Sequence, residues 1–597
     1  MGPLDVKRDE RYPQRSPGQP APGVAQAMTN PALLTIAQRL EHHARSRPND
    51  RAFSFLDDGA DVITRTWGEL AGGARLVAAA LSELPRTREQ PRALLLLPQD
   101  SMFLDALFGC FYAGVCAVPA HVPIPSRLEQ TLPRLCTIAS DARPHVVLTT
   151  RELLAARALV PALADTPCIA IDELGFSEAA DAPARQPGLA EVSLEDLVLL
   201  QYSSGSSGSP HGVMVSHANL MANEAMINEA FEHTQSTMFL SWLPFQHDMG
   251  LIGMLLQPVF TGSECVMMTP VQFLKHPLRW LHEITRYRAN TSGAPNFAYE
   301  MCVAAAERKG DESLAGLDLS SWNLAFVGAE PVRAATLERF EARFADVGFR
   351  REAFYPCYGL AEATLMVSGG RRDEPPKLWN DPAGRTRVSC GRACTGNELA
   401  IVDIARGARC DDGVEGEIWV RGASVAGGYF GHQQSSRETF AATLDGDPQD
   451  GTWLRTGDLG CVVAGEVYVT GRDNDTVIKN GIKFAAEDLE HTVEQLRLEA
   501  LHPSGCAAFG YDDGTRERLV IVNEIKRDAV AAWSDVGDQV VAAIAAAYGM
   551  PADAVVFVQR GSIPRTTSGK IRRSQCRAWY ENGELAEVAR HLTGQRA

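Results

Sequence analysis

The first two thirds of the chain alternate short apolar runs with segments whose apolar residues recur at helical spacing. Four apolar runs have the length and composition of buried strands: Arg92–Leu97, Pro144–Thr149, Leu197–Tyr202 and Asn323–Gly328. Helical patterns lie before or after them: Pro31–Arg45, Ser101–Ala113 and a segment that begins at Glu152. Buried strands that alternate with helices are typical of parallel sheets covered by helices, so we expect an α/β fold.

Beyond about residue 390 the pattern changes to short strands separated by turn residues. Three such strands are predicted: Glu398–Asp403, Gly416–Arg421 and Glu466–Thr470. They indicate a β-rich subdomain over residues 390–472, which ends in the charged turn Gly471–Asp475. The roughly 120 residues that follow have the size of one small α+β domain. We therefore expect a large domain over 28–472 and a small C-terminal domain over 475–597.

The composition is that of an ordinary soluble globular protein. Of the 597 residues, 45% are hydrophobic and 22% are charged, and the formal net charge is −17. A nucleic-acid-binding protein usually needs a broad basic face, so this charge argues against one. The most apolar stretch, Ala106–Ala120, contains Pro119 and is shorter than the roughly 20 residues of a membrane span. Residues 1–27 are rich in Pro, Gln, Gly and Arg and are predicted to be a disordered leader, not a signal peptide.

The 13 cysteines are scattered along the chain, and no pair has the CxxC spacing of a zinc or redox site. Cys390 and Cys394 come closest, but their spacing is CxxxC and no second pair lies nearby. This usage favours reduced thiols and a cytoplasmic protein.

The strongest local motif is a loop rich in Gly and Ser, Gln201–Val213, that follows the apolar run Leu197–Leu200. Glycines allow tight turns and a close approach to a ligand, and successive N–H groups in such a loop form a concave anion site. The expected phosphate-binding residues are Ser203, Ser204, Gly205, Ser206, Ser207 and Gly208. A flexible linker is the alternative, although a linker rarely follows a buried strand directly. The loop is not GxxxxGK[ST], which disfavours a P-loop NTPase.

The loop resembles the phosphate-binding signature of the adenylate-forming superfamily of AMP-binding enzymes. This superfamily includes acyl-CoA synthetases, nonribosomal peptide adenylation domains and luciferases. Its signature usually reads Ser/Thr-Gly-Ser-Thr-Gly-x-Pro-Lys-Gly, and here His211 stands where the lysine is expected. The departure removes a permanent positive charge near the expected position of the pyrophosphate.

Further segments resemble the same superfamily in the same order along the chain: Tyr358–Glu362, Thr456–Asp458, Gly471–Arg472 with Lys479–Gly481, and Ile563–Lys570. The resemblance covers about residues 30–580. It implies a large N-terminal domain of two parallel-sheet α/β subdomains plus the β-rich subdomain. It also implies a small mobile α+β domain, which rotates about a hinge at residues 473–474 with Asn474 at the pivot.

ATP and Mg²⁺ are the cofactors that the resemblance implies. Lys570 would be catalytic and would bridge the acyl carboxylate and the α-phosphate, Glu362 would hold Mg²⁺, and Asp458 would bind the ribose hydroxyls. The other residues expected to bind ATP or AMP are Gly328, Ala329, Glu330, Tyr358, Gly359, Leu360 and Arg472. Since a carboxylate and ATP are both anionic, catalysis would mainly be charge neutralisation and positioning. Outside this context, Lys570 would be interpreted as a solvated surface lysine.

The segment Ser241–Gly253 (SWLPFQHDMGLIG) resembles the fatty acyl-AMP ligase branch of the superfamily. The resemblance puts His247, a catalytic candidate, near the carboxylate end of the acyl site. The expected acyl-binding residues are Met249, Gly250, Ile252, Gly293, Asn296 and Phe297. At helical spacing, apolar residues of this kind also fit a protein core.

Enzymes of this branch typically pass the acyl group to the phosphopantetheine thiol of an acyl carrier protein, here a separate one because no fused carrier domain is apparent. The expected function is therefore activation of a medium- or long-chain fatty acid to acyl-AMP and its transfer to a carrier protein, in lipid, polyketide or lipopeptide biosynthesis. A fatty acyl-CoA ligase is the first alternative, since residues 369–387 look trimmed relative to the insertion of this branch. A non-catalytic nucleotide-binding relative is the second, because of His211 and Ala361.

A basic cluster in the small domain could steer an acidic carrier protein or a phosphopantetheine phosphate, or could be a solvated helix start. Its members are Arg560, Arg565, Lys570, Arg572, Arg573 and Arg577.

Overall fold

The computed structural model describes residues 35–57, 62–84, 90–123, 128–175, 189–203, 210–382, 384–447, 451–472, 476–479, 482–512, 517–548, 550–566 and 569–593. The predicted leader (1–27) and hinge (473–474) lie outside these residues. Within them the protein is mixed α/β, as the sequence predicts.

The largest sheet has nine strands in the order β17-β14-β13-β12-β11-β9-β10-β1-β2. Their bounds are β1 (Arg51–Leu56), β2 (Val62–Thr66), β9 (Met238–Ser241), β10 (Glu264–Met267), β11 (Thr291–Ala294), β12 (Leu324–Val327), β13 (Phe354–Gly359), β14 (Met366–Gly369) and β17 (Arg392–Ala393). The strands from β13 to β1 pair in parallel, and the pairings toward both edges are antiparallel. The carboxyl ends of the parallel strands therefore meet at one edge, where open α/β sheets usually bind ligands.

A second sheet has six strands in the order β6-β5-β3-β4-β7-β8. Their bounds are β3 (Arg92–Leu95), β4 (Cys116–Pro119), β5 (Val146–Thr149), β6 (Cys168–Ala170), β7 (Leu197–Ser203) and β8 (His211–Ser216). All neighbours are parallel except β7 and β8, which form an antiparallel pair that ends with Ser203 opposite His211. The predicted phosphate loop thus begins and ends on two paired strands.

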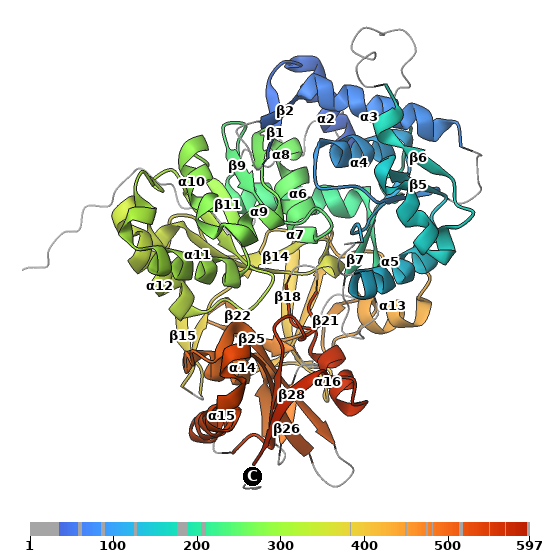
Figure 1. Cartoon of the computed structure of the whole chain (residues 1–597). Helices are drawn as coiled ribbons and strands as arrows, with labels where there is room; N and C mark the ends of the chain where they lie inside the picture. The colour runs from blue at the N-terminus through green and yellow to red at the C-terminus, as the bar shows by residue number, and fades with distance from the viewer. Residues whose placement is uncertain are drawn as a thin grey trace, which may run out of the picture.

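Helices pack around the two sheets and join them into one core, which extends from Ile36 to Ala426. They include α2 (Ile36–Ser46), α3 (Trp67–Ser82), α4 (Ser101–Ala113), α5 (Leu128–Ala142), α6 (His217–Phe231), α10 (Pro277–Tyr287), α11 (Asn296–Lys309) and α12 (Ala334–Phe344). Figure 1 shows α10, α11 and α12 gathered on one side of the large domain and α4 and α5 on the other.

Helix α4 has the bounds that its sequence pattern predicts, because both of its ends are specified locally. Asp100 caps the first turn by accepting a hydrogen bond from the Met102 N–H at 2.9 Å, and Gly114 ends the helix at φ 68°. The apolar stretch Ala106–Ala120 is the end of α4 followed by β4, as expected. The helix predicted from Glu152 is a 3₁₀ helix, η2 (Glu152–Leu159), which has no side-chain cap at its start.

The chain beyond residue 390 forms an antiparallel sheet in the order β19-β18-β20-β21-β22. Its strands are β18 (Asn397–Asp403), β19 (Ala408–Arg409), β20 (Gly416–Gly422), β21 (Leu454–Val463) and β22 (Glu466–Arg472), and they contain the three strands that the sequence predicts. Antiparallel pairing throughout explains the short strands and frequent turns.

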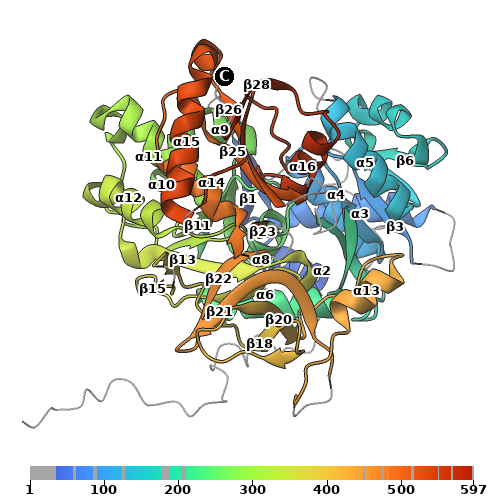
Figure 2. The same cartoon turned by 90° about the horizontal axis from the view of Figure 1, so that it is seen from below.

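The last part of the chain packs a four-stranded sheet, in the order β25-β26-β27-β28, against three helices. Its elements are α14 (Ala486–Gln495), β25 (Leu501–Asp512), β26 (Glu517–Ile525), α15 (Trp533–Tyr548), β27 (Ala554–Val558), α16 (Arg573–Glu581) and β28 (Glu587–Leu592). In Figure 1 this small domain forms a separate layer below the large one, and in Figure 2 it lies in front of it.

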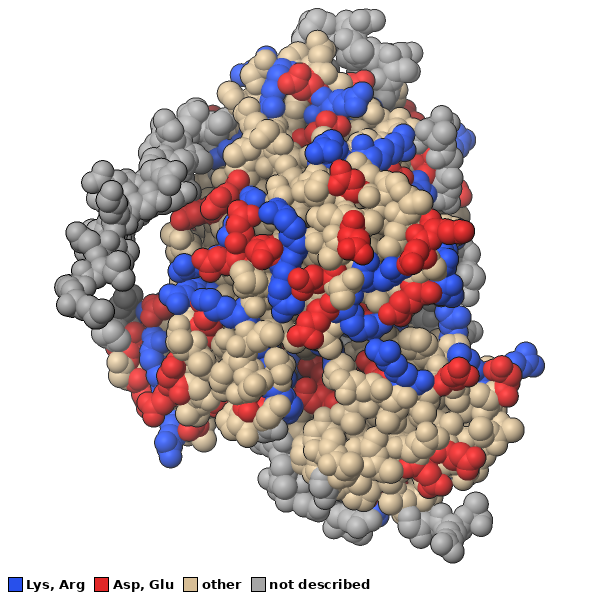
Figure 3. Space-filling view, turned by 90° about the vertical axis from the view of Figure 1, so that its left-hand side faces the viewer, with Lys and Arg blue, Asp and Glu red and all other residues tan. Residues whose placement is uncertain are grey.

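Ion pairs connect the two layers at α14. Asp488 on α14 accepts hydrogen bonds from Arg385 at 2.6 Å and Arg387 at 3.0 Å, and both arginines lie in or beside β16 (Thr386–Val388) of the large domain. Asp381 binds the same two arginines at 2.7 and 3.1 Å. Figure 3, a view of one side of the molecule, shows basic and acidic side chains interleaved in this manner. Arg385 and Arg387, held by Asp381, therefore form part of the contact between the domains.

Across the residues described above, we find no helix that combines the length and the apolar character needed to cross a membrane. The cysteines are all free thiols.

Gly391 lies very close to the backbone of Gly369, the last residue of β14. It has φ +73°, and a Cβ atom there would lie 1.6 Å from the Gly369 carbonyl oxygen. We expect Gly391→Ala to lower the free energy of unfolding by at least about 3 kcal/mol, because backbone strain and overpacking add. Urea unfolding measures the change.

Gly396 provides the matched control, since its φ is +90° but a Cβ atom there would meet nothing within 4 Å. Gly396→Ala should cost only the strain, about 1 kcal/mol. Equal losses in the two variants would contradict the close approach at Gly391.

Candidate active site

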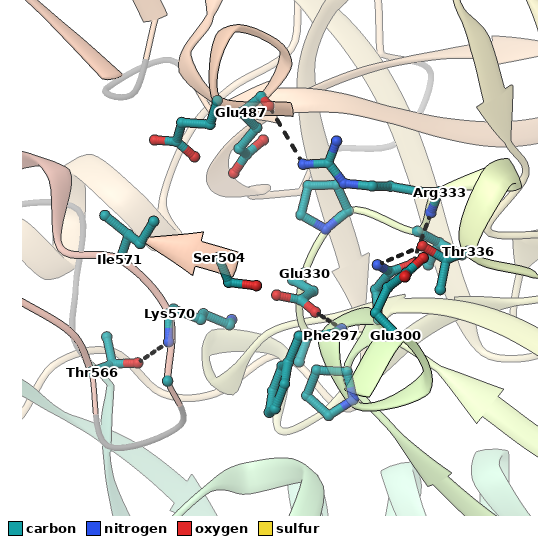
Figure 4. A pocket seen from close by; sticks show the side chains of 18 of the residues that line it. Phe297, Glu300, Glu330, Arg333, Thr336, Glu487, Ser504, Thr566, Lys570 and Ile571 are labelled. Carbon is teal, nitrogen blue, oxygen red and sulfur yellow. Dashed lines mark hydrogen bonds between the residues drawn. The ribbon is translucent and has the colours of Figure 1, made fainter. Parts of the chain in front are cut away.

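A cavity of about 2730 Å³ lies between the two domains and receives side chains from both. It is larger than an ordinary ligand pocket of about 300–1,000 Å³, so it has room for more than one substrate. Figure 4 shows one part of it, where Lys570 from the small domain faces Glu330 and Phe297 from the large domain.

The carboxyl ends of the parallel strands deliver several of these side chains. Glu330 follows β12 after Ala329, whose φ of 65° turns the chain sharply at the end of the strand. One carboxylate oxygen of Glu330 accepts a hydrogen bond from the Phe297 N–H at 2.6 Å, at the start of α11. Burial raises the pKa of Glu330, while this hydrogen bond and the charge of Lys570 lower it. The turn thus holds a carboxylate at the edge of the cavity.

A second carboxylate, Asp458 on β21, has both oxygens engaged. The Tyr358 hydroxyl donates to one oxygen at 2.7 Å, and the Arg472 Nε–H donates to the other at 2.7 Å. The Asp458 N–H also donates to the Thr456 hydroxyl within the same strand. Asp458 is only 4% exposed, and a buried polar group of this kind needs hydrogen-bond partners.

A third carboxylate, Glu362, lies in the short 3₁₀ helix η10 (Ala361–Ala363) that follows β13. The Tyr429 hydroxyl donates to one of its oxygens at 2.9 Å. Burial raises the pKa of Glu362, and its hydrogen bonds and the charge of Arg472 oppose that rise. The bond to Tyr429 fixes the orientation of the carboxylate in the cavity.

Lys570 is the lysine of the small domain that enters this group of carboxylates. Its loop is held by hydrogen bonds between Thr566 and Lys570, from the Lys570 N–H to the Thr566 hydroxyl at 3.0 Å and from the Thr566 N–H to the Lys570 carbonyl at 2.7 Å. Burial and the positive charge of Arg472 lower the pKa of Lys570, and three carboxylates, Asp248, Glu330 and Asp458, oppose this. Figure 4 shows the amine directed toward Glu330.

His247 immediately precedes the short helix α7 (Asp248–Leu251), and its Nδ1 is 2.6 Å from an oxygen of Asp248. The same oxygen accepts the Met249 N–H at 2.7 Å. Burial would raise the pKa of Asp248, but His247 and Lys570 hold it below its usual value. The histidine is therefore fixed at the cavity wall beside a carboxylate.

Most of the predicted site residues that the structure describes line this cavity, and a few do not. The cavity is lined by Lys570, His247, Glu362, Gly328, Ala329, Glu330, Tyr358, Gly359, Leu360, Asp458, Arg472, Met249, Asn296 and Phe297. Ser203 ends β7, whereas Ser204, Gly205, Ser206, Ser207, Gly208 and the pivot Asn474 lie outside the described residues.

Three predicted acyl-binding residues, Gly250, Ile252 and Gly293, are not among the residues that line the cavity. Ile252 is fully buried in the core. A Cβ atom on Gly250 would lie 2.2 Å from the Pro244 carbonyl oxygen, and one on Gly293 would lie 2.3 Å from the ring of Phe326. Both glycines thus allow close backbone packing just behind residues that line the cavity.

Asn296 lines the cavity, but both the nitrogen and the oxygen of its side-chain amide form hydrogen bonds within the protein. It donates to the Thr336 hydroxyl at 3.0 Å and accepts from the Arg333 N–H at 3.0 Å. These bonds give Asn296 a role in fixing the start of α11.

Sequence reasoning missed several residues of the cavity. Tyr429 and Arg134 line it, and neither belongs to a recognisable motif. An apolar part of the wall comes from residues far apart in sequence: Ile227, Phe231, Trp242, Gly253, Met301, Phe326 and Leu365. Apolar periodicity cannot separate these residues from the core, since a pocket wall and a core share the same pattern.

Comparison with known proteins gives matches over most of the chain. The family model described as AMP-binding enzyme matches residues 40–430, and one described as Disco-interacting protein 2-like, AMP domain, matches residues 474–590. The medium-chain-fatty-acid–[acyl-carrier-protein] ligase JamA of Moorena producens is 37% identical over 94% of this chain and 97% of its own. The long-chain-fatty-acid–AMP ligase FadD23 of Mycobacterium tuberculosis is 33% identical over 93% of this chain and 98% of its own.

A solved structure with the same architecture is the fatty acyl-adenylate ligase from Legionella pneumophila in complex with acyl adenylate and pyrophosphate. It is 33% identical, with a TM-score of 0.70 over 96% of this chain and 99% of that one.

The donors around Asp458 generate a prediction about stability. Tyr358→Phe removes one of two side-chain donors to a buried carboxylate and leaves the ring in place. We expect a loss of about 1–3 kcal/mol in the free energy of unfolding, measured with urea, because the carboxylate oxygen keeps its burial without a partner. A change below about 0.5 kcal/mol, within the range of neutral surface substitutions, would contradict a structural role for this bond.

Proposed function

Because the chain belongs to the AMP-binding enzyme family, we propose that it is a ligase for medium- or long-chain fatty acids. It activates the acid with ATP, forms acyl-AMP and pyrophosphate, and then passes the acyl group to the phosphopantetheine thiol of a separate acyl carrier protein. The observation that carries this proposal is the cavity that brings Lys570 beside the strand-end carboxylates. The names of the relatives support the acid and the acceptor.

In the first step, a carboxylate oxygen of the fatty acid attacks the α-phosphorus of ATP. A new P–O bond forms, the bond to the β-phosphate breaks, and pyrophosphate leaves with its electron pair. Lys570 is the proposed catalytic cation, since its amine can lie between the acyl carboxylate and the α-phosphate and offset the charge of both. His247 is proposed to line the carboxylate end of the acyl site.

The nucleotide would be held mainly by the strand ends. Asp458 is proposed to accept hydrogen bonds from the ribose hydroxyls, with Tyr358 and Arg472 keeping its carboxylate oriented. Gly328, Ala329 and Glu330 with Gly359 and Leu360 supply backbone around the nucleotide. The phosphate loop, Ser203 to Gly208, is proposed to bind the phosphates.

A divalent cation fits the carboxylate of Glu362. Mg²⁺ usually takes one or two protein carboxylates together with phosphate oxygens, and we find no group of three metal-ligating side chains among the described residues. Glu362 faces the cavity with one oxygen fixed by Tyr429, which suits a single-carboxylate site. When bound, the ion would offset charge on the phosphates.

The acyl chain is proposed to extend along the apolar wall, past Met249 and Phe297. Phe231, Trp242 and Phe326 supply large apolar surface there, which favours a hydrocarbon over a polar acid.

Transfer requires the thiol sulfur to attack the acyl carbon as AMP leaves. We propose that the small domain, residues 475–597, rotates about Asn474 relative to residues 28–472 to admit the acceptor, a known kind of hinge motion. The free cysteines are consistent with a cytoplasmic enzyme.

Lys570→Ala should lower the rate of fatty-acid-dependent ATP–pyrophosphate exchange by at least about 100-fold, because it removes the charge that brings two anions together. Lys526→Ala, a lysine of the same domain at the cavity rim, serves as the control and should retain exchange within about twofold. Exchange in Lys570→Ala at the rate of the wild type would remove Lys570 from the proposed mechanism.

The acceptor is tested by offering holo carrier protein and free CoA to enzyme loaded with acyl-AMP. We expect thioester formation on the carrier protein to be at least about tenfold faster, since a protein acceptor adds interface contacts beyond the phosphopantetheine arm. Mass spectrometry of the thioesters measures both rates. Faster transfer to CoA would favour the acyl-CoA ligase instead, an alternative suggested by the short segment 369–387.

A further inference from the structure

Arg134 is a partly buried cation that the mechanism above does not use. It lies on α5 and lines the cavity. One of its terminal nitrogens donates to the Tyr202 carbonyl at 3.3 Å, on the strand that leads into the phosphate loop. Its Nε is buried and makes no hydrogen bond with any described residue. A guanidinium held in this way has donor capacity left for a ligand.

The charge of Arg572 acts on Arg134, whereas the neighbouring His121 is neutral at physiological pH. Burial and the charge of Arg572 are the two causes that lower its pKa, to about 10. His121 lies close enough that Arg134, after burial, lowers the histidine's pKa to about 3. Asp141, on the same helix, is engaged by the Tyr202 hydroxyl at 2.6 Å and by His432 at 2.7 Å.

Arg572 comes from the other domain. It follows Lys570 by two residues and lines the same cavity. Its N–H donates to the Pro564 carbonyl at 2.8 Å, which fixes its backbone next to the catalytic loop. It also immediately precedes α16, whose N-terminus adds partial positive charge. Figures 1 and 2 both show α16 on the side of the small domain that faces α5.

An anion that lies between two guanidinium groups in a partly buried cleft is attracted by both charges. The planar donor arrays of arginine match the oxygens of a phosphate group. A phosphate is therefore the class of ligand that this arrangement fits.

We propose that Arg134 and Arg572 form a clamp across the two domains for a phosphate anion, and that its occupant is the pyrophosphate end of ATP. The proposal rests on the proposed function. It also explains how His211 can stand where the superfamily signature has a lysine. The positive charge that this lysine would bring to the phosphates is supplied instead by Arg134 on α5 and Arg572 of the small domain. The phosphodiester of the phosphopantetheine acceptor has the same chemistry, so the test separates these two sources.

The experiment measures two half-reactions of the full-length enzyme. ATP–pyrophosphate exchange gives the KM for pyrophosphate and for ATP, and transfer from supplied acyl-AMP to holo carrier protein involves no pyrophosphate. Arg134→Ala and Arg572→Ala should each raise both KM values by about tenfold or more, because each removes charged hydrogen bonds to phosphate. Transfer from acyl-AMP should stay within about twofold of wild type, since no interaction in this step is removed.

Two further variants guard against a merely structural effect. Arg134→Lys keeps the charge and should recover part of the loss in KM. Arg577→Ala, on α16 but paired with Glu581 at 2.8 Å, should leave exchange unchanged. Thermal unfolding checks that each variant is folded.

Unchanged KM values for pyrophosphate in folded Arg134→Ala and Arg572→Ala would overturn the clamp. Slower transfer from acyl-AMP with normal exchange would assign the site to the acceptor's phosphate and would also overturn it. Wild-type enzyme without exchange for any fatty acid would instead reject the proposed function, and the clamp's occupant with it.

Discussion

A carboxylate can approach the α-phosphate of ATP only if positive charge is held between the two anions, and this constraint organises the cavity. The large domain contributes Glu330 and Glu362 just after strands and Asp458 within β21, together with Arg472. The small domain contributes Lys570. Because burial and Arg472 lower the pKa of Lys570, its charge depends on the acidic residues that face it. The charge of Lys570 therefore depends on how the small domain lies against the large one.

The carboxylates are also held rigidly. Glu330 accepts a backbone N–H, Glu362 accepts the Tyr429 hydroxyl, and Asp458 accepts from Tyr358 and Arg472. Each of these donors comes from a different strand or loop, so correct folding of both large sheets and the β-rich sheet is needed to orient them. Donors fixed in this way do not have to reorganise when substrates bind, and this is where most electrostatic catalysis originates.

Local sequence signals predicted much of this arrangement. The helical pattern over Ser101–Ala113 predicted α4, and the apolar runs at Arg92 and Asn323 became β3 and β12, so the strand end that precedes Glu330 could be located. Tyr429 and Arg134 could not, because their roles come from contacts between distant segments. The pattern around Ile252 and Gly293 could not separate a pocket wall from the core behind it, since both are apolar and buried.

The clamp proposed for Arg134 and Arg572 changes what the His211 substitution means. A lysine in the phosphate loop would stay with the large domain in every arrangement. Two arginines divided between the domains bind phosphate together only when the domains are placed as they are here. Rotation of the small domain would then weaken the hold on pyrophosphate, and bound pyrophosphate would favour the present arrangement by the same free energy. Release of pyrophosphate and opening of the acceptor path thus become coupled steps.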